Sequence, residues 1–128
     1  MVFDDADIPS AVNGVAFAAY VASGQTCVSG TRLILEESIY NEFMAAFVDK
    51  VKRSKQASAS AGSFYAPTVI EDIDVEDELW KQEVFGPILV VTKFQNEGQP
   101  YVSPTTASMA LVPAYGHGTL AVLIVWLL

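Results

Sequence analysis

FAAYVASGQTCVSGTRLIL, residues Phe17 to Leu35, runs from an alanine-rich segment through a glycine-flanked loop into a short apolar stretch, and it holds the single cysteine, Cys27. The alanine-rich segment from Pro9 to Tyr20 predicts a helix, with Gly24 as its stop signal. The stretch from Thr31 to Leu35 is rich in strand formers and predicts a buried strand. The sequence therefore places Cys27 in a loop that leads from a helix into a strand.

The residues after this stretch continue the alternation of helices and strands. Ser38 to Lys55 predicts a helix, because its apolar residues recur at four-residue steps, at Ile39, Phe43, Phe47 and Val51. Further strands are predicted at Thr68–Ile73 and Ile88–Phe94, with a short helical turn at Asp74–Trp80 and a tight turn at Phe85–Pro87. The alternation predicts an α/β fold with a parallel or mixed sheet, although the elements are too few for a complete doubly wound sheet.

Length, charge and composition limit the classes of function. The 128 residues suffice for one ordinary domain, and a net charge of −8 disfavours nucleic acid as a partner. The longest apolar run, Leu120–Leu128, is far shorter than the roughly 20 residues of a membrane helix, so no membrane association is expected. A single cysteine cannot form an internal disulfide, which favours a reducing, cytoplasmic location. One cysteine and one histidine supply too few ligands for a metal site.

Cys27 has two interpretations when its neighbours alone are considered. Glycines beside a thiolate allow a substrate to approach the backbone and free amide groups to hold an oxyanion, so Cys27 could be a nucleophile. A free cysteine is also among the most frequently buried residues, so Cys27 could equally be a small core side chain. The residue pattern leaves both interpretations open.

Several motifs together resemble the NAD(P)-dependent aldehyde dehydrogenase family. The stretch YVASGQTCVSGTRL is similar to the active-site signature of that family, whose places are filled by Tyr20, Gly24, Gln25, Cys27, Gly30 and Arg32. The stretches VFDDADI, ESIYNEF, GSFYAPTVIEDID and ELWKQEVFGPILVVTKF also resemble family segments, and they occur in the family's order. Together they cover most of the chain from Met1 to Phe94.

The resemblance implies a chemistry and three site residues. It implies that the Cys27 thiolate attacks a small aldehyde to give a thiohemiacetal, that hydride passes to NAD or NADP, and that water releases the acid from a thioester. The main-chain N–H of Cys27 is then one oxyanion donor. Glu83 matches the glutamate that holds the nicotinamide ribose, and Phe85 matches the aromatic residue beside the nicotinamide.

The resemblance also implies that this is a partial catalytic domain with an incomplete sheet. Residues 1–97 are expected to form that domain, shortened at 56–62 where the family has several further elements, and residues 98–128 to form a divergent tail. The family's dinucleotide-binding domain and its water-activating glutamate precede the matched segments, so the chain alone is expected not to bind cofactor or turn over. The alternatives are a non-catalytic protein that docks on a full-length family member, and a domain with a redox-reactive thiol.

Overall fold

The computed structural model describes residues 1–55, 65–74 and 76–95, so the predicted linker at 56–62 and tail at 98–128 lie outside the described residues. The elements follow in the order α1 (Ile8–Tyr20), η1 (Val21–Gly24), β1 (Arg32–Glu36), η2 (Glu37–Ile39), α2 (Tyr40–Lys55), β2 (Thr68–Ile70), α3 (Glu78–Lys81) and β3 (Ile88–Phe94). The predicted α/β alternation is confirmed. Among the described residues no helix has the length and apolar character needed to cross a bilayer.

The three strands form a parallel sheet in the order β1-β3-β2. Arg32 of β1 lies opposite Val90 of β3, and Thr68 of β2 lies opposite Ile88. Parallel neighbours require crossover connections, and α2 lies in the crossover that leads from β1 towards β2. The last strand in the sequence therefore occupies the centre of the sheet.

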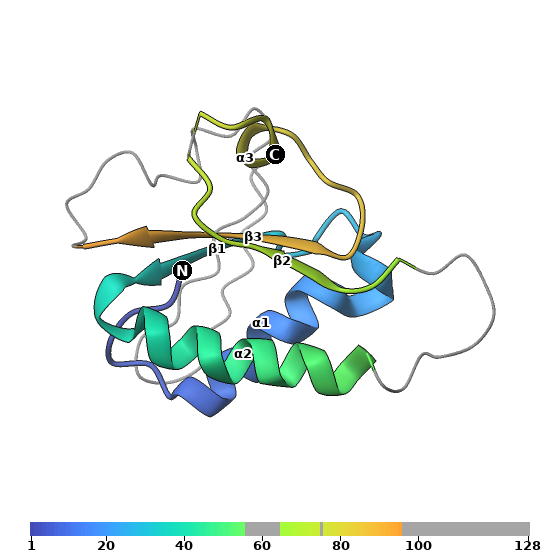
Figure 1. The fold of residues 1–128 in the computed structure, drawn as a ribbon. Helices are drawn as coiled ribbons and strands as arrows, with labels where there is room; N and C mark the ends of the chain where they lie inside the picture. Colours follow the sequence, from blue (N-terminus) through green and yellow to red (C-terminus); the bar gives the residue numbers. More distant parts are fainter. Residues whose placement is uncertain (56–64, 75, 96–128) are drawn as a thin grey trace.

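The two faces of the sheet are covered by different elements. Figure 1 shows α1 and α2 on one side of the sheet and α3 on the other. Leu89 and Val91 of β3 pack with the two long helices, whereas Val90 packs into the second cluster, which also contains Phe3, Ile34, Trp80 and Phe94. Because successive strand side chains point to opposite faces, this alternation leaves the centre of β3 buried on both sides.

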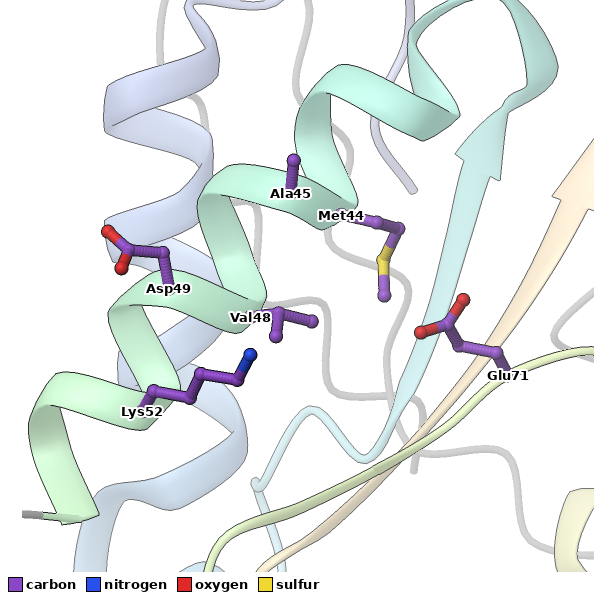
Figure 2. Close-up of a pocket in the computed structure, with 6 residues that line it drawn as sticks. All are labelled: Met44, Ala45, Val48, Asp49, Lys52 and Glu71. Carbon is purple, nitrogen blue, oxygen red and sulfur yellow. The ribbon is translucent and has the colours of Figure 1, made fainter.

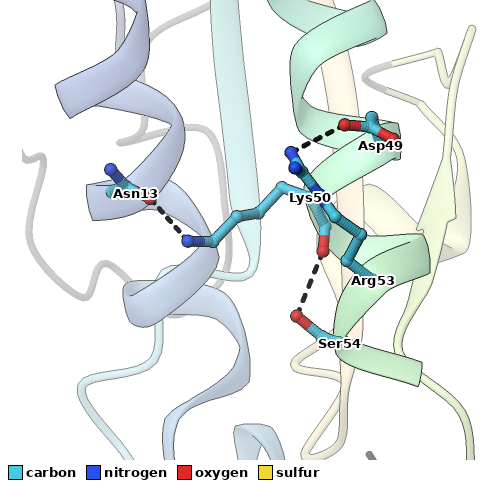
Figure 3. A network of polar contacts seen from close by, with 5 residues as sticks. All are labelled: Asn13, Asp49, Lys50, Arg53 and Ser54. Carbon is cyan, nitrogen blue, oxygen red and sulfur yellow. Dashed lines mark hydrogen bonds and ion pairs between the residues drawn. The ribbon is translucent and has the colours of Figure 1, made fainter. Parts of the chain in front are cut away.

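The two long helices begin close to their predicted positions. The Asp7 carboxylate accepts a hydrogen bond from the Ser10 N–H at 3.0 Å and caps α1 one residue before its start. The predicted helix at Ser38–Lys55 divides into η2 and α2, and its four predicted core residues are all buried, namely Ile39, Phe43, Phe47 and Val51. Lys50 joins the two helices by donating to Asn13 Oδ1 at 2.6 Å (Figure 3).

Two predicted elements are shorter than expected. The strand predicted at Thr68–Ile73 ends at Ile70, because Asp72 has a φ of 55°, which lies outside the extended region. The helical turn predicted at Asp74–Trp80 begins only at Glu78 and continues to Lys81. The chain between β2 and α3 is therefore a loop that carries Glu71 and Asp72.

Candidate active-site loop around Cys27

A reversal of the chain separates α1 from the loop that carries Cys27. Three successive residues adopt left-handed backbone angles, with φ values of 50° at Ala22, 61° at Ser23 and 68° at Gly24. The left-handed conformation costs a residue with a side chain about 1–2 kcal/mol, and such strained positions are concentrated at functional sites. The sequence predicted a stop at Gly24 but gave no sign of the two strained residues before it.

Cys27 lies in a tight turn that is closed on both sides. The Ser29 N–H donates to the Thr26 carbonyl at 3.0 Å, and the hydroxyls of Thr26 and Ser29 lie 2.7 Å apart. The Gly30 N–H donates to the Ala18 carbonyl at 2.9 Å, which fastens the end of the loop to α1. These contacts fix the turn on either side of the cysteine without involving its side chain.

The turn presents the thiol to solvent. Cys27 is exposed, so the interpretation of this residue as a small core side chain is wrong. Within the described part of the chain, the main-chain N–H of Cys27 has no hydrogen-bond acceptor. An exposed sulfur and an available N–H on one residue are the two groups needed to attack a carbonyl carbon and to hold the resulting oxyanion.

Gly24 brings the cysteine loop against the second predicted turn. A Cβ atom at Gly24 would lie 2.1 Å from the carbonyl oxygen of Gly86 and 3.0 Å from the nitrogen of Pro87. This approach is possible only without a side chain. The contact places the loop of Cys27 beside the turn of Phe85–Pro87, although the two segments are far apart in the sequence.

Phe85 begins this second turn, Glu83 lies two residues before it, and both residues are exposed. Phe85 is 52% exposed, and Phe17 and Tyr65 are more exposed still. Phe85 thus offers an exposed aromatic surface at the turn that meets the cysteine loop, and Glu83 offers an exposed carboxylate two residues earlier in the chain.

Arg32 ties the start of β1 to the chain just before Glu83. Its Nη2 donates to the Gln82 carbonyl at 3.3 Å, and its guanidinium lies 5.9 Å from the centre of the Trp80 ring. Burial lowers the pKa of Arg32, and the negative charge of Glu83 opposes this shift. Arg32 occupies a place in the cysteine motif, but the sequence did not indicate that its partners lie around Glu83.

Tyr20 connects the end of α1 to β2, and its replacement tests this connection. Its hydroxyl donates to the Thr68 carbonyl at 3.1 Å, and burial raises its pKa to about 12. We expect Tyr20→Phe to lower the free energy of unfolding by about 1 kcal/mol at neutral pH, the usual net value of one hydrogen bond. Urea unfolding followed by far-UV circular dichroism measures this difference.

The raised pKa of Tyr20 also predicts how the stability of the fold changes at alkaline pH. The folded state holds the Tyr20 proton more tightly than the unfolded state, whose pKa is near 10. Its contribution is therefore complete below about pH 10 and is lost as the pH rises towards 12. Tyr20→Phe should lose less stability than the native chain over this range. Equal losses in both proteins would contradict the assignment of this shift to Tyr20.

Comparisons with known proteins identify relatives of this arrangement. The sequence model of the aldehyde dehydrogenase family matches residues 1–59 and 53–101. The mitochondrial succinate-semialdehyde dehydrogenase of Oryza sativa is 30% identical, over 76% of this chain and 26% of the relative. An aldehyde dehydrogenase of Emericella nidulans is 26% identical, over 77% of this chain and 28% of the relative.

Solved structures show the same similarity. Betaine aldehyde dehydrogenase from Staphylococcus aureus, crystallised in complex with NAD+, has a TM-score of 0.67 and 26% identity, and the match covers 74% of this chain and 28% of that protein. An NAD-dependent aldehyde dehydrogenase from Sinorhizobium meliloti gives a TM-score of 0.67 at 25% identity. The chain thus spans between a quarter and a third of the length of the proteins that it matches.

Proposed function

This chain belongs to the aldehyde dehydrogenase family, and on that premise we propose that Cys27 is the nucleophile that attacks the carbonyl carbon of a small aldehyde. The observation that carries the proposal is the exposed turn that presents the Cys27 thiol and main-chain N–H together. The thiolate sulfur bonds to the carbonyl carbon, the π electrons move to oxygen, and protonation of that oxygen completes a thiohemiacetal. The N–H of Cys27 holds the oxygen while it is negatively charged.

Glu83 and Phe85 are proposed to hold the nicotinamide end of NAD or NADP. The exposed carboxylate of Glu83 has the chemistry to accept hydrogen bonds from ribose hydroxyls, and the exposed Phe85 ring offers a flat surface. The Gly24–Gly86 contact brings the turn that begins at Phe85 against the cysteine loop, and Glu83 precedes that turn by two residues. The residues present therefore fit this end of the cofactor, which when bound supplies the acceptor for hydride.

The 128 residues by themselves are proposed to carry out the attack but not the full reaction. Glu83 and Phe85 hold only one end of a dinucleotide, and hydride transfer demands close alignment of the reacting atoms. We assign residues 1–97 to the family domain and residues 98–128 to a divergent tail. The exposed free thiol is best preserved in a reducing compartment, for which we propose the cytoplasm.

The nucleophile proposal predicts that an aldehyde protects Cys27 from alkylation. A thiohemiacetal has no free thiolate, so saturating propanal should slow labelling by iodoacetamide at least about tenfold, as expected when most of the thiol is occupied. Mass spectrometry measures the labelled fraction over time, and propan-1-ol is the matched control. Cys27→Ser should remain unlabelled throughout. An equal labelling rate with and without propanal would refute the role of Cys27 as an aldehyde nucleophile.

The second half of the proposal predicts that no reduced cofactor is formed. The purified chain, given NAD or NADP and a panel of small aldehydes, should show no increase in absorbance at the wavelength of the reduced nicotinamide. Cys27→Ser is measured in parallel. Turnover in the native chain that disappears in this variant would show that the 128 residues are a minimal dehydrogenase and would overturn this part of the proposal.

A further inference from the structure

The turn that carries Cys27 is closed by two separate contacts between the same pair of residues. Thr26 and Ser29 are half-buried, whereas Cys27 and Val28 between them are exposed. The Ser29 N–H donates to the Thr26 carbonyl at 3.0 Å, and the two hydroxyl oxygens lie 2.7 Å apart. Many four-residue turns lack even the backbone bond, so the hydroxyl pair is a second lock on this one.

The closed turn fixes the direction of the Cys27 N–H. The Thr26 carbonyl and the Cys27 N–H belong to one peptide unit, which is planar and trans, so the two groups point in opposite directions. Because the carbonyl is directed into the turn towards Ser29, the N–H of Cys27 is directed out of the turn. This is the direction from which a bound oxygen can reach it.

The orientation of this peptide unit depends on Ser29. The Ser29 side of the turn is anchored, because the next N–H, that of Gly30, donates to the Ala18 carbonyl of α1 at 2.9 Å. In the part of the chain that the structure describes, Thr26 makes its hydrogen bonds to Ser29 alone. The backbone bond and the hydroxyl pair are therefore what hold the Thr26 side of the turn in place.

We propose that Thr26 and Ser29 are positioning residues, whose hydroxyl pair keeps the Cys27 N–H directed towards the oxygen of an attacked carbonyl group. The inference rests on the role proposed for Cys27 and adds the side chains that aim its oxyanion donor. Neither hydroxyl needs to touch the substrate. Loss of either one leaves the backbone bond as the only lock, and a donor that is not held in advance stabilises the developing charge less well.

Two reagents separate the direction of the N–H from the exposure of the thiol. With p-nitrophenyl acetate, the Cys27 sulfur bonds to the carbonyl carbon, the π electrons move to oxygen, and their return expels p-nitrophenolate and leaves acetyl-cysteine. With iodoacetamide, the sulfur bonds to a saturated carbon as iodide leaves, and no oxyanion forms. A misdirected N–H should therefore slow acetylation without slowing alkylation.

Thr26→Val and Ser29→Ala each remove one hydroxyl of the pair. Either change should slow acetylation of Cys27 at least about tenfold, a part of the roughly 10²–10³-fold effect of removing an oxyanion donor, and should alter alkylation less than about twofold. The double variant should be no slower than the single variants, because both changes remove the same contact. Thr26→Ser keeps a hydroxyl and should recover the native rate of acetylation.

Two controls test whether the effect is confined to the turn. Thr31→Val removes a hydroxyl that has no hydrogen-bond partner among the described residues, so acetylation should change less than about twofold. Lys52 is an internal reference, because it is exposed and lines an open hollow along α2 with Met44 and Val48 (Figure 2). Mass spectrometry should show the same acetylation of Lys52 in all variants.

Hydrogen exchange adds a measurement that does not depend on reactivity. The Ser29 amide should exchange faster in Thr26→Val than in the native chain, because the turn opens more often. Equal acetylation in the native chain and the two single variants would overturn the inference, and so would equal slowing of acetylation and alkylation. Both results leave the protection of the native Cys27 by propanal intact, whereas loss of that protection would refute the role of Cys27 and this inference with it.

Discussion

Gly24→Ala is expected to destabilise the protein by about 2–5 kcal/mol, since it adds the cost of a left-handed alanine to that of overpacking. The φ of Gly24 is 68°, and the new methyl group would meet the Gly86 carbonyl oxygen at 2.1 Å. The clashing atom belongs to the backbone, so relief requires the cysteine loop and the Phe85–Pro87 turn to move apart. Urea unfolding followed by far-UV circular dichroism measures the change in the free energy of unfolding.

Gly86→Ala is the matched control for this substitution. A Cβ at Gly86 would meet nothing within 4 Å, so the change should alter stability by no more than about 0.5 kcal/mol. The pair therefore separates the contact between two segments from a general intolerance of side chains in these loops. Similar losses in the two variants would show that the close approach of Gly24 to Gly86 does not hold the loops together.

The Gly24→Ala variant also provides a test of the role proposed for Cys27. Moving the loop away from the Phe85–Pro87 turn should leave the thiol of Cys27 exposed, because the Thr26–Ser29 turn is closed by its own hydrogen bonds. Alkylation should therefore persist in Gly24→Ala wherever the variant remains folded. Gly24 thus sets the contact between the cysteine loop and the Phe85–Pro87 turn, whereas exposure of the thiol depends on the local turn.

Local patterns in the sequence predicted most of the elements and one side of the core. The four-residue spacing of Ile39, Phe43, Phe47 and Val51 identified the buried face of α2, because helical periodicity is a property of neighbouring residues. The β1-β3-β2 order could not be read in the same way, since it depends on which strands pair across long separations. The end of β2 was also missed, because an aspartate with positive φ has no reliable local signal.

The residues of the candidate site could be proposed from sequence motifs, but their arrangement in space could not. The glycine-flanked loop and the resemblance to the family signature made Cys27 a candidate, and the later stretch Glu83–Pro87 made Glu83 and Phe85 candidates. The contact between the two segments that carry these residues depends on Gly24 meeting Gly86 and on Arg32 reaching Gln82, and these contacts join residues 50 or more positions apart. Such pairs carry no periodicity, so single-sequence patterns cannot reveal them.

Trp80 is the second residue whose loss should have a large effect. Its side chain is 1% exposed and packs in the cluster formed by Phe3, Ile34, Val90 and Phe94. Trp80→Ala should lower the free energy of unfolding by about 3–5 kcal/mol, the usual cost of removing a buried aromatic side chain. Leu79→Ala is the matched control, because Leu79 lies on the same short helix but is 38% exposed, and its loss should be below about 1 kcal/mol.

The destabilisation caused by Trp80→Ala should extend from the core to the segment that carries Glu83. α3 has only four residues, far fewer than an isolated helix needs, so its position depends on the burial of Trp80. The Trp80 ring also lies under the Arg32 guanidinium, which in turn holds the Gln82 carbonyl beside Glu83. Hydrogen exchange in Trp80→Ala should therefore rise at Gln82 and Glu83 before it rises in α2. A uniform rise over both regions would show that Trp80 supports the whole fold rather than the segment that carries Glu83.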